Sequence, residues 1–291
     1  MKKESLKGIL LIFGSVVSFS AMAGFVKLLP HINSTTTVFY RFAIGLGLLG
    51  ALALLRIIKL KFVNYKLLFI RGLSGGLAVF ILYLSIIKLG IGKASIYSYS
   101  YPIFSSIFSI FILKDKIPFG KWVLIFFAFT GLILLSIDIS AGNSLFKKFN
   151  IYELIAIIGS MLAGISIVVV KKLHDTDDSY AIFFSQTIVG FWIFLIPSTT
   201  MQFSGRINDG IILMAIGIIA MVGQLLMTEG YKYSSVTTGS SLALIIPVFN
   251  SLIGVLFFNE IFTGIELFGG SIILVCCLLI VLYNQLKRML I

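Results

Sequence analysis

Charged side chains are scarce in this chain of 291 residues: Asp, Glu, Lys and Arg together make up 12%, about half of the roughly 25% found in soluble domains. Hydrophobic residues make up 59%, and the mean hydropathy is +1.10. A single soluble core of this length cannot bury so much apolar surface. The composition therefore excludes a soluble enzyme, a nucleic-acid binder and a disordered chain, and it indicates a protein solvated by a lipid bilayer.

Acidic residues are fewer than basic ones, and the net charge is +12. The basic residues stand alone or in pairs in short gaps between apolar runs, whereas a nucleic-acid patch needs Lys and Arg clustered on one soluble face. Lys and Arg in such gaps instead orient membrane helices. We therefore expect the lipid bilayer and a small-molecule substrate as partners, and no nucleic acid.

Residues that bind metals or perform covalent chemistry are also few. The chain has two cysteines, the adjacent Cys276 and Cys277, and two histidines. They form no metal-binding spacing, and the HExxH, Walker and G-x-S-x-G motifs are absent. The Asp-rich segment 174–179 fits helix capping in a loop. We expect no enzyme, no catalytic residue, no metal, no cofactor and no ATP-driven pumping.

Ten apolar runs are each long enough for a transmembrane helix of about 20 residues. They lack the period-2 alternation of barrel strands. The runs lie near residues 6–29, 35–56, 66–88, 93–113, 119–138, 151–173, 179–200, 208–232, 235–258 and 263–286. The sequence therefore predicts an all-α integral membrane protein with ten transmembrane helices. The first run lacks a cleavage site and is taken as a retained helix.

The distribution of Lys and Arg predicts the orientation of the chain. With the N-terminus inside, fifteen of these residues fall in inside segments and five in outside segments, when Lys27, Arg41 and Arg71 are left out as membrane-embedded. Because positive residues gather on the cytoplasmic side, both termini are expected in the cytoplasm. The expected location is the bacterial cytoplasmic (inner) membrane.

The chain repeats itself when it is shifted by 145 residues. The shift pairs Gly14 with Gly159, Lys27 with Lys172, Gly45 with Gly190, Gly72 with Gly217, Pro102 with Pro247 and Asp115 with Glu260. Each pair falls within or beside the same-ranked run of its half, which predicts two five-helix repeats over residues 1–145 and 146–291. Because five is odd, the second repeat must be inverted in the membrane, and inverted repeats suit alternating access.

Short segments resemble the EamA type of the drug/metabolite transporter superfamily. They are Phe39–Phe42 in the second run, Tyr101–Ser105 in the fourth, and the run ends Leu113–Asp115 and Phe258–Glu260. Lys114 and Asn259 replace the glycine usual in the family at those two ends. The resemblance covers nearly the whole chain and implies secondary transport of small metabolites, often as export.

Two prolines at matched positions, Pro102 and Pro247, are expected inside helices. There each removes a backbone hydrogen bond and clashes with the carbonyl four residues back. Such kinks could open a cavity near the membrane midplane or only curve a packed helix, and both interpretations stay open.

Five candidate substrate-binding residues lie in the fourth and ninth runs: Tyr97, Ser98, Tyr101, Ser240 and Asn250. The two tyrosines are one helical turn apart and could stack on an aromatic or amphipathic substrate, although a Tyr pair also suits packing. Small polar residues either line a hydrated path or let helices pack closely.

Three candidates lie in other runs. Arg41 either snorkels to the outer surface or supplies a cation for an anionic group. Gln224 is an amide that needs a partner from another helix or from a ligand. Glu229 could carry a proton or hold a cationic substrate, or it could simply pair with Lys232 three residues on.

These residues and the resemblance favour a secondary transporter that moves an amino acid or a similar amphipathic solute by alternating access, with export as the expected direction. A membrane-embedded enzyme on a lipid-type substrate and a channel stay open as alternatives. The inverted repeat favours the transporter because it has no obvious use in an enzyme. We expect a monomer or a homodimer.

Overall fold

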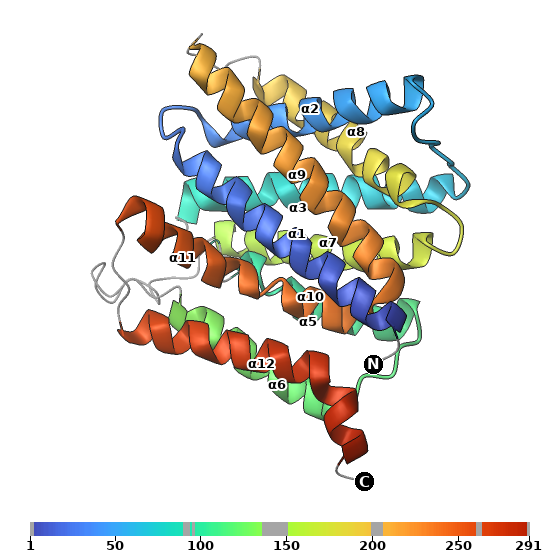
Figure 1. Cartoon of the computed structure of the whole chain (residues 1–291), viewed down its shortest axis with the longest axis vertical. Helices are drawn as coiled ribbons and strands as arrows, with labels where there is room; N and C mark the ends of the chain where they lie inside the picture. Colours follow the sequence, from blue (N-terminus) through green and yellow to red (C-terminus); the bar gives the residue numbers. More distant parts are fainter. Residues whose placement is uncertain are drawn as a thin grey trace.

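The structure is a computed structural model that describes residues 3–89, 94, 97–135, 151–198, 206–259 and 264–289. Its helices, labelled in Figure 1, are α1 (Lys3–Lys27), α2 (Ser34–Leu54), α3 (Tyr65–Leu89), α5 (Tyr101–Ile112), α6 (Phe119–Leu135), α7 (Ile151–Leu173), α8 (Ser179–Ser198), α9 (Ile207–Tyr233), α10 (Val236–Leu242), α11 (Ile245–Phe258) and α12 (Gly264–Met289). The described residues contain no strand, so the predicted all-α class is confirmed for them.

Among the residues that the structure describes, ten helical segments match the ten apolar runs. Six are long and apolar enough to cross a membrane, with α10 and α11 counted as one segment, and four are apolar helices of 10–17 residues. Large apolar side chains remain uncovered on the outside of the bundle: Phe111 is 76% exposed and Phe257 is 75% exposed. Lipid is the solvent that such a surface requires.

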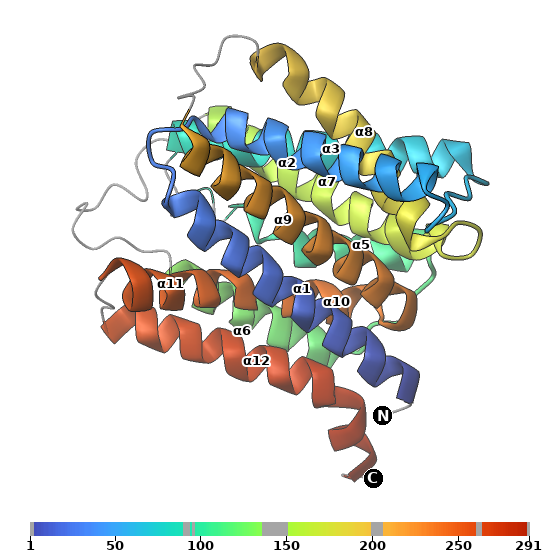
Figure 2. The same cartoon turned by 45° about the horizontal axis from the view of Figure 1, so that its top comes forward.

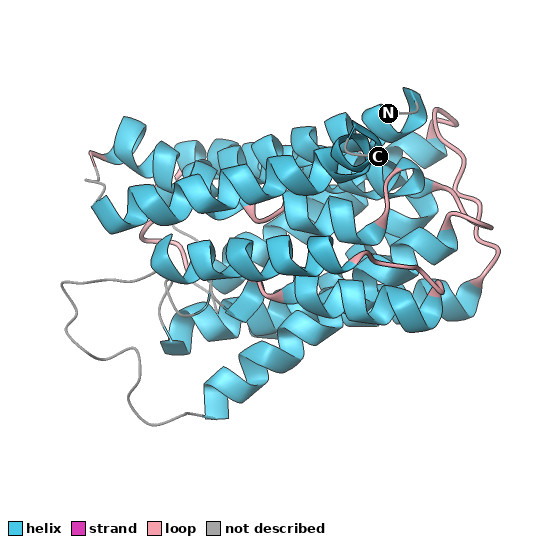
Figure 3. Cartoon of the chain, turned by 90° about the horizontal axis from the view of Figure 1, so that it is seen from below, coloured by secondary structure: helices cyan, strands magenta, loops and turns pink. Residues whose placement is uncertain are grey.

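The helices form one bundle in which segments from the two halves of the chain alternate. Helix α1 packs along α9, and α3 packs along α7 and α8. Helix α2 contacts α8 and α9, α5 lies on α7, and α11 lies on α1. Helices α6 and α12 pair with each other at one edge, at the bottom of Figures 1 and 2. Most helices run along a common direction (Figure 3).

Glycines let the closest helices touch. A Cβ atom on Gly230 of α9 would lie 2.5 Å from Cγ1 of Ile12 on α1, and one on Gly159 of α7 would overlap Ile81 of α3. Helices in lipid associate through close van der Waals contact, for which small residues are needed. These glycines therefore fix the two long contacts between the halves.

The two matched prolines lie at the starts of helices, which corrects the expected placement inside continuous ones. Pro102 is the second residue of α5, and Pro247 is the third residue of α11. In the ninth run, the N–H of Ile246 donates to the carbonyl of Ala243 at 3.0 Å. That tighter turn satisfies the carbonyl that Pro247 leaves without its helical donor. The ninth run is therefore a broken helix, α10 followed by α11.

The start of α1, the end of α12 and the loops at residues 55–64 and 174–178 lie toward one end of the bundle, at the right in Figure 1. The loop at residues 28–33 and the start of α9 lie at the other end. The predicted repeat boundary between residues 145 and 146, and Glu260, lie outside the described residues.

Candidate functional site

A cavity of about 250 Å³ lies between the helices. Its lining residues come from α1, α2, α3, α5, α7, α8, α9, α10 and α11 and from the turns beside α5 and α11, whereas no described residue of α6 or α12 lines it. The volume is just below the roughly 300–1,000 Å³ of sites for drug-sized ligands. It therefore suits a small metabolite.

Arg71 of α3 is a buried charge in the cavity wall, only 3% exposed. Its guanidinium donates to Ser166 Oγ of α7 and, at 2.6 Å, to Gln186 Oε1 of α8, while its Nε–H has no partner among the described residues. Gly75 leaves room for this cluster, because an added Cβ would overlap Arg71 Nη1 and lie 2.9 Å from Ser166 Oγ. Arginine stays protonated in proteins, so the wall holds a fixed positive charge.

Arg41 of α2 supplies a second guanidinium to the same cavity. Its Cζ atom lies 5.7 Å from the ring centres of both Phe19 and Phe42, a cation–π distance. Unlike Arg71, this arginine is therefore held mainly by aromatic side chains.

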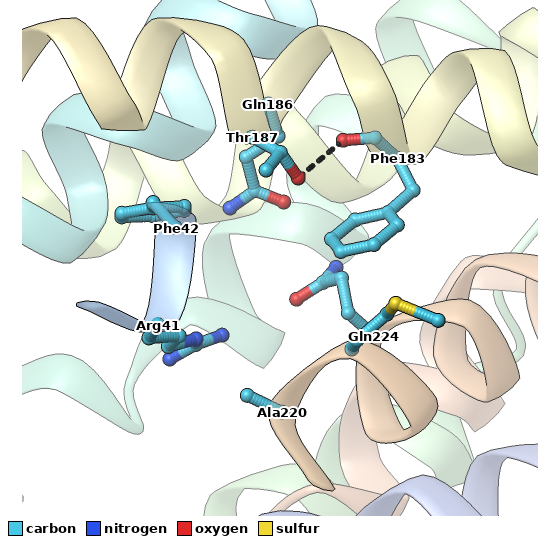
Figure 4. Close-up of a pocket in the computed structure, with 8 residues that line it drawn as sticks. Arg41, Phe42, Phe183, Gln186, Thr187, Ala220 and Gln224 are labelled. Atoms are coloured by element: carbon cyan, nitrogen blue, oxygen red, sulfur yellow. Dashed lines mark hydrogen bonds between the residues drawn. The ribbon is translucent and has the colours of Figure 1, made fainter. Parts of the chain in front are cut away.

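Amide side chains face the two arginines from the second half of the chain. Figure 4 shows Arg41, Gln186 and Gln224 pointing into a shared space between α2, α8 and α9. Gln224 is 4% exposed. Its Nε2 atom and the Oδ1 atom of Asn250 on α11 are both buried and have no hydrogen-bond partner among the described residues. Buried polar atoms almost always have a partner, whether protein, water or ligand. These atoms are therefore available to a bound molecule.

Tyrosines form much of the remaining wall. Tyr83 of α3, Tyr99 and Tyr101 beside the start of α5, and Tyr231 of α9 all line the cavity. A tyrosine offers an apolar ring face together with a hydroxyl group. The cavity can thus accept an amphipathic molecule whose apolar part meets the rings.

The charged side chains among the described residues that line the cavity are all positive. No Asp, Glu, Lys or His is among the described residues that line it, whereas Arg41 and Arg71 both do. Two positive charges without an acidic neighbour in a low-dielectric cleft raise the local concentration of anions. The arrangement therefore favours a bound anion over a cation.

Four of the predicted substrate-binding residues line this cavity: Arg41, Tyr101, Gln224 and Asn250. They come from α2, α5, α9 and α11, and the fold brings them together. Their role in binding a substrate stays a prediction.

The other three predicted residues, Tyr97, Ser98 and Ser240, are not among the residues that line the cavity. The prediction assumed a continuous helix through the fourth run, but residues 99 and 100 form a turn that changes which side chains face inward. Ser240 is fully buried in α10, and its hydroxyl donates to Thr237 O at 3.3 Å. Its contact is thus within its own short helix.

Sequence reasoning missed seven polar wall residues: Ser15, Arg71, Tyr83, Tyr99, Ser166, Gln186 and Tyr231. A signal existed for Arg71, because it is the single charge between Lys66 and Lys88 in an apolar run. An ionisable residue inside a membrane segment is a functional candidate by default. No comparable signal distinguished the tyrosines from ordinary packing residues.

Glu229 is also absent from the residues that line the cavity. Its carboxylate accepts a hydrogen bond from Ser179, the first residue of α8. Lys232, the partner considered from the sequence, instead places its ammonium group 5.7 Å from the centre of the Tyr233 ring. This arrangement ties α9 to the N-terminal end of α8, where a negative charge is favourable.

The Asp-rich loop after α7 performs the capping expected of it. Asp178 Oδ1 accepts from the N–H of Ala181 at 2.7 Å, in the first turn of α8. Asp177, 5% exposed, accepts from the N–H of Val63 at 2.7 Å in the loop between α2 and α3.

His174 Nε2 lies 2.7 Å from Thr228 O, and burial lowers the pKa of this histidine.

The sequence profile of the EamA-like transporter family matches residues 6–137 and, a second time, residues 150–282. The chain belongs to this family. The resemblance seen in the sequence is thereby confirmed, and the chain is a membrane transport protein of the drug/metabolite transporter superfamily rather than a member of an enzyme family.

Similar proteins include the pseudopaline exporter CntI of Pseudomonas aeruginosa, which is 25% identical over 93% of this chain and 94% of its own length. Solute carrier family 35 member G1 of Mus musculus is 23% identical over 90% of this chain and 74% of its own length. A solved crystal structure shares the fold, with a TM-score of 0.78 over 97% of this chain and 98% of the other, at 15% identity.

Proposed function

We propose that this protein is a secondary transporter that moves a small amphipathic solute, such as an amino acid, across the membrane by alternating access. The observation behind the proposal is a metabolite-sized cavity enclosed by helices of both halves and lined by arginine, amide and tyrosine side chains. The two halves act as inverted five-helix repeats around it. One copy of the chain supplies the whole described wall, so a monomer is the proposed transport unit.

The pattern of helix contacts supports the repeats. The 145-residue shift pairs α1 with α7, α2 with α8 and α3 with α9. When each helix is replaced by its counterpart, the α1–α9 contact becomes the α7–α3 contact, and the α2–α9 contact becomes the α8–α3 contact. The same replacement turns α5–α7 into α11–α1, and it leaves the pairs α2–α8 and α6–α12 unchanged. When the helix contacts of two halves are equivalent in this way, each half can adopt the conformation of the other, which is the basis of alternating access.

Contacts between loops at opposite ends of the bundle also support alternation. At one end, Asp177 accepts from the N–H groups of Val63 and Asn64. At the other, His31 Nε2 lies 2.8 Å from Asp209 Oδ2. The 145-residue shift places Asp209 on Asn64 and His31 next to Asp177. We propose that each contact closes one side of the cavity, with the termini and Asp177 on the cytoplasmic side.

The expected direction is export across the bacterial cytoplasmic membrane. It is supported by the name of the similar CntI protein, a pseudopaline exporter, and by the excess of Lys and Arg in the loops at the end that holds the termini.

Counterflow in proteoliposomes tests this function. Vesicles with the purified protein are preloaded with unlabelled L-phenylalanine and diluted into a trace of labelled L-phenylalanine, without ATP. A carrier gives a transient accumulation of label above equilibrium that protein-free vesicles do not show. Equilibration without this overshoot would favour a channel, and no protein-dependent flux across a panel of amino acids would contradict the proposal.

A further inference from the structure

We infer that the solute bound in the central cavity carries a carboxylate group, which Arg71 binds with Gln224 as a second donor, and an N–H or O–H donor, which Asn250 accepts. This inference rests on the proposed transport function, since it names the chemistry of the solute. Its basis is the set of buried polar atoms in the wall that have no partner among the described residues: Arg71 Nε, Gln224 Nε2 and Asn250 Oδ1.

Arg71 is suited to hold an anion because it is fixed in place. Two of its five N–H donors are used by Ser166 and Gln186, on two different helices. The remaining donors, among them Nε–H, belong to the planar fork that binds a carboxylate. A side chain locked by neighbouring hydrogen bonds holds its free donors in a defined geometry.

Arg41 has a different role, because its guanidinium lies at cation–π distance from the rings of Phe19 and Phe42. It adds positive potential to the cavity but is already engaged. The wall holds one free guanidinium N–H and one free amide N–H₂ group. Together they can supply donors to the two oxygens of a single carboxylate.

The rest of the solute follows from the rest of the wall. Asn250 Oδ1 can only accept, so the solute must present a donor such as an ammonium or hydroxyl group to it. Tyr99 and Tyr101 offer ring faces to an apolar body. A hydrophobic or aromatic amino acid combines these three groups within about 250 Å³.

Binding to purified protein tests the inference without transport. Thermal unfolding is followed with three probes: L-phenylalanine, L-phenylalaninamide, which lacks the carboxylate, and 3-phenylpropionate, which lacks the amino group. We expect L-phenylalanine to bind at least tenfold more tightly than L-phenylalaninamide. Arg71→Gln should abolish that preference, and the matched control Arg206→Gln, at the exposed start of α9, should keep it.

Asn250→Leu tests the second contact. It should weaken the binding of L-phenylalanine to that of 3-phenylpropionate and leave 3-phenylpropionate unaffected. If Arg71→Gln does not fold, Arg71→Lys keeps the charge but loses the planar fork, and it should weaken L-phenylalanine at least tenfold without affecting L-phenylalaninamide.

Equal affinities for the acid and the amide, an unchanged preference in the Arg71 variants, or no stabilisation by any probe would overturn the inference. Failure of the transport proposal would look different. In that case the probes would bind in the expected order while counterflow remained absent.

Discussion

Arg41 of α2 and Gln186 of α8 stand 145 residues apart in the chain and meet in one cavity (Figure 4). The 145-residue shift places one on the other, yet one is a cation and the other a neutral amide. Arg71 also belongs to the first half, and Gln224 to the second. The positive charge of the cavity therefore comes from the first half. In the proposed alternating access, a bound anion would stay with that half while the second half moves.

The geometry of the Arg71 cluster can be tested without removing a charge. In Gly75→Ala, the new methyl group would overlap Arg71 Nη1 and lie 3.0 Å from Gln186 Nε2. Since the cluster must shift, we expect at least a tenfold weaker affinity for L-phenylalanine in the thermal-unfolding assay, with a folded protein. Gly50→Ala is the matched control, because nothing lies within 4 Å of its added Cβ. Equal affinities in the two variants would contradict the importance of this geometry.

The all-α fold and its ten apolar segments could be predicted because hydrophobic length is a strong signal in membrane proteins. The break before Pro247 was harder to place. Proline disfavours a helical conformation in the residue before it, but the position of the turn at residues 243 and 244 depends on packing around α10, all of whose residues are buried. The periodicity of apolar residues in the sequence does not predict that packing.

The site was predictable only in part for a related reason. Arg41, Gln224 and Asn250 are polar residues in apolar runs, and the fold directs them into the cavity. Tyr97 and Ser98 were chosen on a continuous helix, and the turn at residues 99 and 100 places Tyr99 in the wall instead. The pairing of Arg71 with Gln186 depends on the contact between α3 and α8, which no local pattern encodes.

The orientation can be checked by labelling single cysteines in intact cells, after Cys276 and Cys277 are replaced. A cysteine at Asn33 or Asn208 should react with an impermeant maleimide from outside, and one at Asn64 or Thr176 should react only after permeabilisation. The basis is the excess of Lys and Arg on the side of the termini. The reverse pattern would invert the proposed topology.

Asp177 should stabilise the end of the bundle at which it lies. Asp177→Ala removes the acceptor of the Val63 and Asn64 N–H groups, and hydrogen bonds to a charged group contribute about 1.5–3 kcal/mol each. We expect a lower unfolding temperature and faster hydrogen exchange at residues 63 and 64. Asp175→Ala is the control, since this exposed carboxylate forms a surface ion pair with Lys172 and should change stability by less than about 1 kcal/mol. Similar effects of both variants would argue against the contact.

The pH dependence of stability should report His174. Burial lowers the pKa of His174 below its usual value of 6.5, so the folded protein resists a proton that the unfolded chain accepts. The contribution of His174 to the free energy of unfolding is full above about pH 6.5. It decreases as the pH falls from about 6.5 toward the pKa of His174 in the folded state. His174→Gln keeps a side-chain donor for Thr228 O and should flatten the thermal-unfolding profile between pH 7.5 and 5.5. His31→Gln retains His174 and should keep the decrease; an unchanged profile in His174→Gln would refute the assignment.

Glu229 offers a test of whether a carboxylate in α9 couples transport to protons. Because it accepts from Ser179 and does not line the cavity, we expect a structural role. Glu229→Gln keeps the size of the side chain and an oxygen acceptor for Ser179 but cannot titrate. The variant in proteoliposomes should therefore accumulate L-phenylalanine under an imposed pH gradient to about the wild-type level, with a somewhat lower unfolding temperature.

Ser179→Ala removes the same hydrogen bond from the other side and should lower the unfolding temperature similarly. If Glu229→Gln instead loses gradient-driven accumulation while counterflow exchange persists, the carboxylate carries the coupled proton, and Ser179→Ala should not reproduce that loss.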